Sequence, residues 1–303
     1  YYRLLRILTM LYRLNNQYLS VEINSLGAEL KSVKNLSNDI EYMWQANPEF
    51  WDRTSPVLFP IVGRLTNNTT LINNQAYEIT QHGFVRDMEF RCLEQSASQL
   101  LFSISSNEQT RIRYPFDFEL TIRYTLQEST VLVQWQVSNP NRDTMPFSIG
   151  AHPAFSTQLQ PQDQFEDYEV SFDQAKQYYL WQLNDAMQLV DKPVAFQESL
   201  QTFTLSYHYF EIDALVFPHR QINTISLKNK DHGHGVIVDF TGFPEVALWT
   251  ADGKNKRSPF LCIEPWFGYA DLQNGAPELS NKAGIQHLAA GETFNAQYGI
   301  TFF

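Results

Sequence analysis

Short runs of β-branched and aromatic residues, separated by turn-forming residues, dominate this sequence. Several of these runs alternate polar and apolar side chains, and a period of two is typical of strands that bury one face. The clearest runs are residues 18–23 (YLSVEI), 100–105, 118–126, 130–137, 235–240 and 246–250. A chain with many such strands buries their apolar faces most economically in a large antiparallel β-sandwich. We therefore predict an all-β fold.

Signals for helices are sparse. Residues 47–52 (NPEFWD) predict one helical turn, and residues 173–179 predict a slightly longer helix. The alternation of strands and helices that marks a doubly wound fold is absent from the sequence, as are internal repeats and linker-like segments. We expect residues 15–303 to form a single domain, preceded by an N-terminal extension, residues 1–14, of uncertain role.

Composition narrows the classes of partner. The net charge of −11 and the isoelectric point near 5.1 disfavour nucleic acid and anionic membrane surfaces. Two cysteines far apart in the sequence, Cys92 and Cys262, support neither a disulfide framework nor a structural zinc site, so we expect a cytoplasmic protein. Residues 1–14 (YYRLLRILTMLYRL) are too short and too charged to span a bilayer and lack a signal-peptide cleavage site; Met10 is a candidate natural start.

Two segments that interrupt the strand pattern carry basic residues. Residues 55–65 (SPVLFPIVGRL) end an apolar run with Arg64, whose guanidinium needs either a ligand or a carboxylate partner at the edge of the core. Residues 81–87 (QHGFVRD) place His82 before a glycine, which lets backbone approach a ligand closely; the alternative is a structural histidine. Arg86 and Asp87 in the same segment predict an ordinary surface ion pair.

Two further segments carry the strongest acid-base candidates. In residues 146–155 (PFSIGAHPAF), small neighbours leave room for a ligand beside His152, and Pro153 restricts the backbone that carries it. In residues 260–271 (FLCIEPWFGYAD), Glu264 follows an apolar run, and apolar surroundings raise a carboxyl pKa towards the range of a general base near neutral pH. The alternative for Glu264 is a side chain that points outward from a strand end.

Other chemical motifs are weaker. Residues 232–235 (HGHG) have a histidine spacing that can bind metal from a strand, but the surrounding glycines and aspartate favour a turn. The glycine-rich motifs of nucleotide-binding proteins and the G-x-S-x-G motif of esterases do not occur. Phe155 and Trp266 are candidates for stacking on a sugar ring, although aromatic residues in a sandwich are more often core residues.

Taken in order, the motifs SPVLFPIVGRL, QHGF, PFSIGAHPAF and CIEPWFGYAD resemble those of the aldose 1-epimerase (galactose mutarotase) family, especially its LacX-like branch. The resemblance runs from about Tyr18 to the C-terminus and leaves residues 1–14 outside. It implies a galactose mutarotase-like supersandwich with an open carbohydrate cleft, a small sugar as partner, and neither metal nor cofactor.

The resemblance also implies roles for individual residues. Glu264 in IEPW matches the general base that takes the proton of the anomeric hydroxyl, and His152 in GAHPAF matches the general acid that protonates the ring oxygen. His82 in QHGF would hydrogen-bond the oxygens around the anomeric carbon, and Arg64 in VGRL would help to hold the sugar. Asp213 in FEIDALVF is the best match for an aspartate that binds sugar hydroxyls, although its surrounding motif is loose.

This chemistry suits the residue types, because opening a cyclic hemiacetal removes one proton from the anomeric hydroxyl and delivers another to the ring oxygen. We therefore expect a mutarotase acting on a free hexose. Two alternatives remain: an epimerase of a hexose 6-phosphate, with Arg64 and Arg86 as the obvious phosphate-binding candidates, and a non-catalytic carbohydrate-binding protein on the same fold. The preferred sugar and the oligomeric state cannot be predicted from the sequence.

Overall fold

A computed structural model describes residues 9–251 and 256–303 of the chain. Within these ranges most of the regular structure consists of strands, and the helices are one α-helix and five short 3₁₀ helices. The large antiparallel β-sandwich predicted from the sequence is confirmed. The strands belong to four sheets, which contain fifteen, three, two and two strands.

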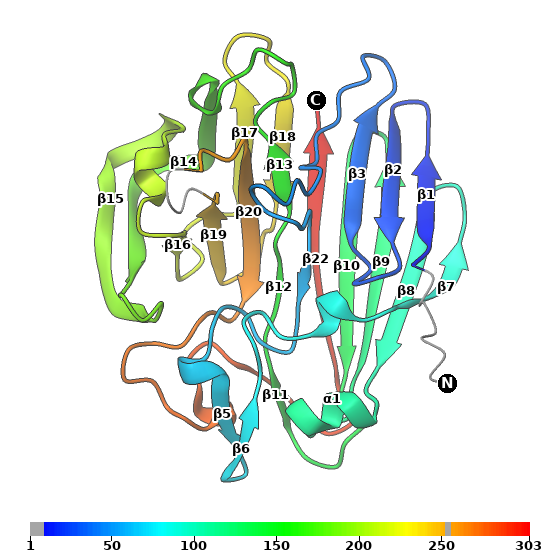
Figure 1. Ribbon diagram of the computed structural model, residues 1–303, viewed down its shortest axis with the longest axis vertical. Helices are drawn as coiled ribbons and strands as arrows, with labels where there is room; N and C mark the ends of the chain where they lie inside the picture. Colours follow the sequence, from blue (N-terminus) through cyan, green and yellow to red (C-terminus); the bar gives the residue numbers. More distant parts are fainter. Residues whose placement is uncertain (1–8, 252–255) are drawn as a thin grey trace.

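The fifteen-stranded sheet forms the body of the molecule, and its neighbouring strands run antiparallel (Figure 1). Along its main path the strands are β4 (Val57–Leu58), β12 (Ile149–Ala151), β20 (Phe260–Phe267), β19 (Glu245–Trp249), β16 (Leu215–Phe217), β14 (Tyr168–Leu183), β17 (Thr224–Asn229), β18 (Gly235–Asp239), β22 (Thr293–Phe302), β10 (Thr130–Ser138), β9 (Glu119–Gln127), β8 (Gln99–Ser105) and β7 (Arg91–Gln95). Off this path, β13 (Ala154–Ser156) pairs with β20, and β15 (Leu189–Thr204) pairs with β14.

The three-stranded sheet covers one end of the large sheet. It consists of β1 (Leu11–Asn15), β2 (Leu19–Asn24) and β3 (Leu30–Asn35), which Figure 1 shows in front of β8, β9 and β10. Alternate residues of β2 are buried, as the period of two predicts. The two layers meet at aromatic side chains: the rings of Tyr12 and Phe102 lie 5.3 Å apart edge to face, and the Tyr124 hydroxyl donates to the Ala28 carbonyl at 2.7 Å.

The remaining elements are small. The two-stranded sheets pair β11 (Met145–Phe147) with β21 (Gln286–Leu288) and β5 (Thr69–Ile72) with β6 (Gln75–Glu78). The 3₁₀ helices are η1 (Thr66–Asn68), η2 (Val85–Asp87), η3 (Phe165–Asp167), η4 (Tyr207–Phe210) and η5 (Leu279–Asn281). Helix α1 (Glu108–Arg113) was not predicted; its signal is Asn107, whose side chain accepts hydrogen bonds from the Gln109 and Thr110 amides as an N-cap.

The two helical predictions have different outcomes. Near residues 47–52 the chain makes a single hydrogen-bonded turn, in which the amide of Trp51 donates to the Asn47 carbonyl at 3.0 Å. The helix predicted at residues 173–179 is wrong, because these residues lie within β14. The register of β14 against β15 shifts between Ser171 and Lys176 and again before Tyr178, and these irregularities break the alternation that would have indicated a strand.

The segment expected to be an N-terminal extension divides into two parts. Residues 1–8 lie outside the described residues, whereas Leu11–Asn15 form β1 and pair along their whole length with β2. Leu14 is completely buried, so this part of the segment contributes to the core.

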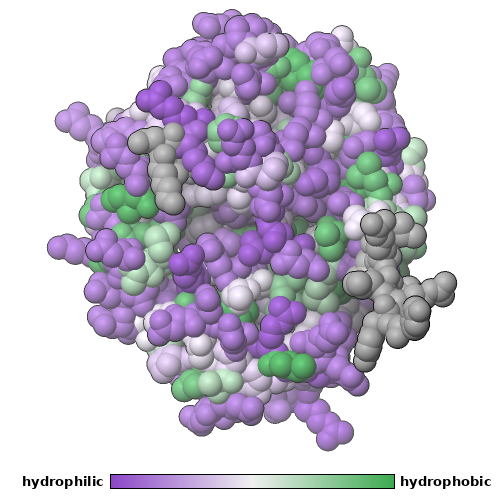
Figure 2. Space-filling view, in the orientation of Figure 1, coloured by the Kyte–Doolittle hydropathy of each residue, from purple (hydrophilic) through white to green (hydrophobic). Residues whose placement is uncertain are grey.

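Figure 2 shows mainly hydrophilic residues on the face presented, with hydrophobic residues in small separate groups. In the described ranges, every helix is too short or too polar to cross a lipid bilayer.

Candidate active site

Strand β20 carries the central carboxyl group of the site. Pairing of β20 with β19 sets Glu264 opposite Ala247 and Cys262 opposite Trp249. Since side chains alternate along a strand, Cys262, Glu264 and Trp266 share one face of β20, while Leu261 and Ile263 point into the main core. Glu264 does not point outward at a strand end: its side chain is only 2% exposed.

Glu264 lies in a cleft of about 370 Å³ that contains all five site residues predicted from the sequence. These residues are Arg64, His82, His152, Asp213 and Glu264. They come from segments up to 200 residues apart, since Arg64 follows β4, and Glu264 lies in β20. The fold thus gathers the four sequence motifs and Asp213 around one cavity.

Glu264 and His152 form the closest pair of titratable side chains in the cleft, with Nε2 of His152 3.2 Å from Oε2 of Glu264. Burial raises the pKa of the Glu264 carboxyl, an effect that the nearby Asp213 charge reinforces. Burial lowers the pKa of the His152 imidazole. Both shifts disfavour the combination of a carboxylate and an imidazolium. They favour the neutral pair, in which the carboxyl holds the one proton that the two groups can exchange.

Aromatic rings hold His152 in place. The indole of Trp51 stacks on its imidazole with ring centroids 4.8 Å apart and an interplanar angle of 28°, and Trp249 approaches it edge-on at 5.5 Å. Trp51 is itself positioned by the Trp44 indole, which donates to the Trp51 carbonyl at 2.9 Å. These ring contacts fix the orientation of an imidazole that has few hydrogen bonds of its own.

A backbone contact fixes the tautomer of His82. The amide of Gly63 donates to Nδ1 of His82 at 3.1 Å, so the ring proton resides on Nε2. Burial, together with the neighbouring His152, lowers the pKa of His82 well below its usual range and keeps the ring neutral. Nε2 faces the Gln81 side-chain nitrogen at 3.3 Å, and two donors cannot satisfy each other. The Nε2–H of His82 is therefore available to an oxygen of a ligand.

Asp213 and Arg64 line the cleft with their polar ends engaged by neighbours. Asp213 accepts a hydrogen bond from the Trp249 indole at 2.7 Å, which leaves its second carboxylate oxygen for other donors. Arg64 donates to the Gln81 side-chain oxygen at 3.2 Å. Gln81 thus lies between Arg64 and His82, and it is a cleft residue that the sequence analysis did not single out.

Two more arginines line the cleft, and the prediction for one of them is confirmed only in part. Arg86 forms the predicted ion pair with Asp87, but its Nε is 4.0 Å from the carboxylate and its side chain is only 17% exposed, so the arginine does not lie at the surface. Asp87 forms a shorter ion pair with Arg53, at 2.8 Å. One guanidinium nitrogen of Arg86 donates to the Gln81 carbonyl at 2.7 Å, while its buried Nε has no hydrogen-bond partner. The cleft therefore contains three guanidinium groups, those of Arg53, Arg64 and Arg86.

Apolar side chains complete the cleft. Leu183, Met187 and Leu189 come from the tip of the β14–β15 hairpin, and Trp266 comes from β20. Of the two aromatic residues considered for sugar stacking, Trp266 lines the cleft, whereas Phe155 is buried in the main core.

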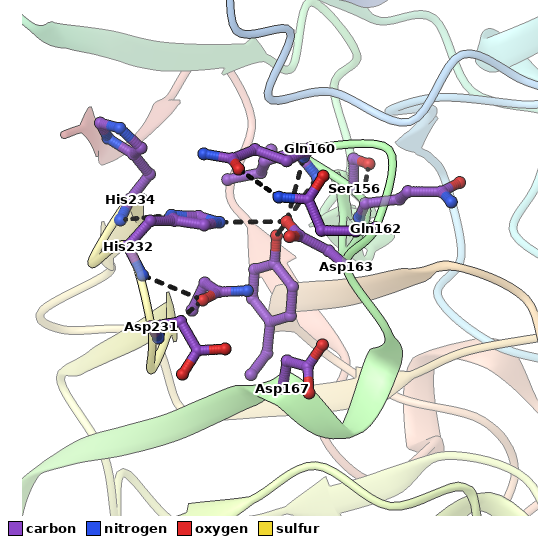
Figure 3. A network of polar contacts seen from close by, with 12 residues as sticks. Ser156, Gln160, Gln162, Asp163, Asp167, Asp231, His232 and His234 are labelled. Atoms are coloured by element: carbon purple, nitrogen blue, oxygen red, sulfur yellow. Dashed lines mark hydrogen bonds and ion pairs between the residues drawn. The ribbon is translucent and has the colours of Figure 1, made fainter.

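The histidines of the HGHG motif belong to a separate network. His232 contacts Asp163 through Nε2 at 3.1 Å and accepts the His234 amide through Nδ1 at 3.1 Å (Figure 3). Asp163 also accepts from the Tyr168 hydroxyl at 2.7 Å. These contacts tie the turn after β17 to the segment before η3, which is a structural role. The group of three side chains that can coordinate one metal ion in the described ranges lies elsewhere, at His152, Cys262 and Glu264.

Comparisons with known proteins identify the family. The family described as aldose 1-epimerase matches residues 10–301. Protein LacX, plasmid, from Lactococcus lactis subsp. lactis is 33% identical over 300 residues, covering 96% of this chain and 99% of that protein.

Two solved structures have closely similar folds. A galactose mutarotase related enzyme from Lactobacillus acidophilus superposes with a TM-score of 0.92 at 33% identity, covering 97% of both chains. A galactose mutarotase-like protein from Lactobacillus casei ATCC 334 has a TM-score of 0.91 at 25% identity, with 97% of this chain and all of that chain covered. The family match begins at residue 10, earlier than the Tyr18 expected from the motifs. The chain belongs to the aldose 1-epimerase family.

Proposed function

We propose that the cleft converts the α and β anomers of a hexose into each other by opening and reclosing the sugar ring, with Glu264 and His152 as the acid-base pair. The observation that carries this proposal is the 3.2 Å contact between the Glu264 carboxyl and the His152 imidazole inside a ligand-sized cleft. Its volume, about 370 Å³, lies within the range of small-molecule sites, about 300–1,000 Å³.

Ring opening requires the ionised pair, with the proton on His152 and Glu264 as a carboxylate, which is one proton transfer away from the neutral pair that burial favours. Glu264 removes the proton of the anomeric hydroxyl, the oxygen forms a carbonyl with the anomeric carbon, and the bond from that carbon to the ring oxygen breaks. The imidazolium of His152 gives its proton to the departing ring oxygen. The products are an open-chain aldehyde, a protonated Glu264 and a neutral His152, so the charges balance.

Reclosure uses the same groups in exchanged roles. After rotation about the bond next to the aldehyde, His152 takes back the hydroxyl proton as the oxygen attacks the carbonyl carbon, and Glu264 protonates the carbonyl oxygen. Burial favours the neutral state of the pair, which is the state needed for closure. The Nε2–H of His82 would stabilise negative charge on the oxygens at the reacting carbon. These proton transfers require only side chains, so we propose a cofactor-independent isomerase.

Asp213 and Arg64 are proposed to hold the sugar hydroxyls. The carboxylate of Asp213 accepts hydrogen bonds, the guanidinium of Arg64 donates them, and both face the cleft. We propose that residues 15–303 act as one catalytic domain. A cytoplasmic setting is supported by two cysteines that are free thiols.

A hexose 6-phosphate is a second candidate substrate, favoured by the three arginines of the cleft. Arg86 lines the cleft, and its Nε makes no hydrogen bond, although it lies 4.0 Å from the Asp87 carboxylate. Charge-assisted bonds from guanidinium to phosphate are among the strong polar contacts in proteins. Sequence analysis had counted Arg64 and Arg86 towards such a site, and Arg53 adds a third charge.

Anomer exchange on four sugars distinguishes the candidates. Fresh α-glucose, α-galactose and their 6-phosphates are followed by NMR of the anomeric protons, with wild-type protein and with Glu264→Gln. The matched control is Glu245→Gln, which also replaces a buried carboxyl but lies outside the cleft. Exchange by wild type and the control, but not by Glu264→Gln, supports the proposal, and the faster pair of sugars identifies the substrate class. Sugar binding by a wild-type protein that accelerates none of the four reactions would instead support a carbohydrate-binding protein.

A further inference from the structure

Cys262 lies beside the acid-base pair, yet the proposed reaction does not use it. It precedes Glu264 by two residues on β20, so the two side chains share one face of the strand. The thiol is completely buried and packs in a small apolar cluster with Trp44, Ala154 and Phe260. A buried cysteine of this kind is usually a small apolar core residue.

The surroundings of Cys262 differ from an ordinary core because two other potential metal ligands approach it. A ring nitrogen of His152, a carboxylate oxygen of Glu264 and the sulfur of Cys262 all lie within 4.8 Å of one another. Within residues 9–251 and 256–303, these side chains form the group of three that can coordinate one ion. The three side chains are each less than a tenth exposed.

The chemistry of these ligands selects a class of metal. Zinc binds thiolate, imidazole and carboxylate at about 2.0–2.3 Å, so two ligands of one tetrahedral ion lie about 3.5 Å apart. The 3.2 Å contact of His152 and Glu264 already has this spacing, and the 4.8 Å limit on the sulfur leaves about 1 Å to be closed by side-chain rotation. A sulfur ligand favours zinc-like ions over magnesium and calcium, which prefer oxygen.

The cleft gives an ion access and leaves one coordination position open. His152 and Glu264 both line the cleft, whereas Cys262 is not one of its lining residues. A tetrahedral ion held by these three side chains would direct its fourth position away from the thiol, where water or a sugar hydroxyl could bind. The cleft arginines oppose a cation, but a thiolate and a carboxylate together neutralise the two charges of the ion.

We propose that His152, Cys262 and Glu264 form an inhibitory binding site for a divalent cation of the zinc class. Binding converts the Cys262 thiol to a thiolate and releases its proton to solvent. The ion occupies the lone pairs of Glu264 and His152 that the proton transfers need, so metal and catalysis exclude each other. The binding site itself does not depend on the proposed function; the inhibition does.

Cobalt(II) is a suitable probe, because coordination by a thiolate gives Co²⁺ an intense charge-transfer absorption in the near ultraviolet that nitrogen and oxygen ligands alone do not give. The full-length protein, reduced and freed of metal with a chelator, is titrated with Co²⁺, and Zn²⁺ is then added. Three proteins are compared: wild type, Cys262→Ala, and Cys92→Ala as a matched control at the partly exposed second cysteine. Cys262→Ser serves as a further variant that keeps the volume of the site.

The expected result is one Co²⁺ per chain in wild type and in Cys92→Ala, with the thiolate absorption abolished by Zn²⁺. Both Cys262 variants should lack this absorption, and their dissociation constant for Co²⁺ should rise by about 10- to 100-fold or more, since even the loss of a residue behind a metal ligand has effects of that size. Absence of the absorption in wild type would overturn the proposal, as would its persistence in the Cys262 variants.

A separate measurement tests inhibition. Zn²⁺ should slow anomer exchange by wild type and Cys92→Ala at concentrations at least about 10-fold lower than those needed for Cys262→Ala. If no sugar is exchanged by any of the proteins but the absorption is present, the proposed function fails and the metal site stands. If exchange occurs and Zn²⁺ inhibits wild type and Cys262→Ala equally, the inhibitory role is refuted while the mutarotase remains.

Discussion

Glu245 provides a test of the electrostatics of the sheet that carries the site. This carboxyl lies in β19, is only 7% exposed, and accepts one hydrogen bond, from the Gly268 amide at 3.3 Å. Burial raises its pKa from 4.5 to about 7, although the Gly268 amide and the charges of Arg220 and Lys282 act in the opposite direction. Glu245→Gln keeps the size of the side chain and an oxygen that can accept from Gly268, but removes the ionisation.

The direction of the stability change depends on whether the folded or the unfolded chain binds the Glu245 proton more tightly. The folded protein holds this proton more strongly than the unfolded chain does, so ionisation destabilises the fold as the pH rises from about 4.5 through about 7. Each unit of pKa difference corresponds to about 1.4 kcal/mol, which gives a total near 3 kcal/mol. Between about pH 5 and about pH 8, the free energy of unfolding of Glu245→Gln should therefore rise by about 2.5 kcal/mol relative to wild type.

Urea unfolding of both proteins at the two pH values, followed by tryptophan fluorescence and circular dichroism, measures this difference directly. The variant should gain most at the higher pH. A stability difference that is the same at both pH values would show that Glu245 does not titrate between them, and would refute the reasoning.

Three further predictions concern particular contacts. Trp51→Leu removes the ring stacked on His152 and should lower kcat about 10-fold or more with a smaller change in KM, while Trp51→Phe restores most of the rate. A rise in KM with kcat unchanged would contradict a positioning role. Asp163→Ala removes the acceptor of the His232 network and should lower the free energy of unfolding by about 2–4 kcal/mol in urea titrations, with anomer exchange unchanged at temperatures where the variant is folded. Arg86→Met should raise KM for a hexose 6-phosphate by about 10-fold or more and affect a free hexose less; equal effects on both sugars would argue against a phosphate contact.

The fold was predictable because it depends on local patterns, and alternating strands predicted the sandwich. The residues at the centre of the site were predicted from the motifs around Arg64, His82, His152 and Glu264 and from the resemblance of these motifs to the aldose 1-epimerase family. Asp213, predicted from a loose motif, also lines the cleft. The catalytic and binding roles of these five residues stay predictions.

Contacts between distant segments were not predictable in the same way. Arg86 and Asp87 are adjacent in the sequence, which predicted their ion pair, but the fold also brings Arg53 to Asp87 from 34 residues away and places Arg86 in the cleft. Trp51 carries no motif, and only the packing of its turn against His152 reveals its position. The helix predicted at residues 173–179 failed because irregular pairing of a long hairpin removes the period of two.

The central claim is that Glu264 exchanges protons with the anomeric hydroxyl of a bound sugar. Its most direct test is the rate of exchange between α- and β-galactose, measured by NMR at equilibrium with wild type and Glu264→Gln, together with galactose binding by both proteins. The account predicts a rate lower by at least about 10²-fold in the variant, with binding retained. Equal exchange rates in the two proteins would contradict it.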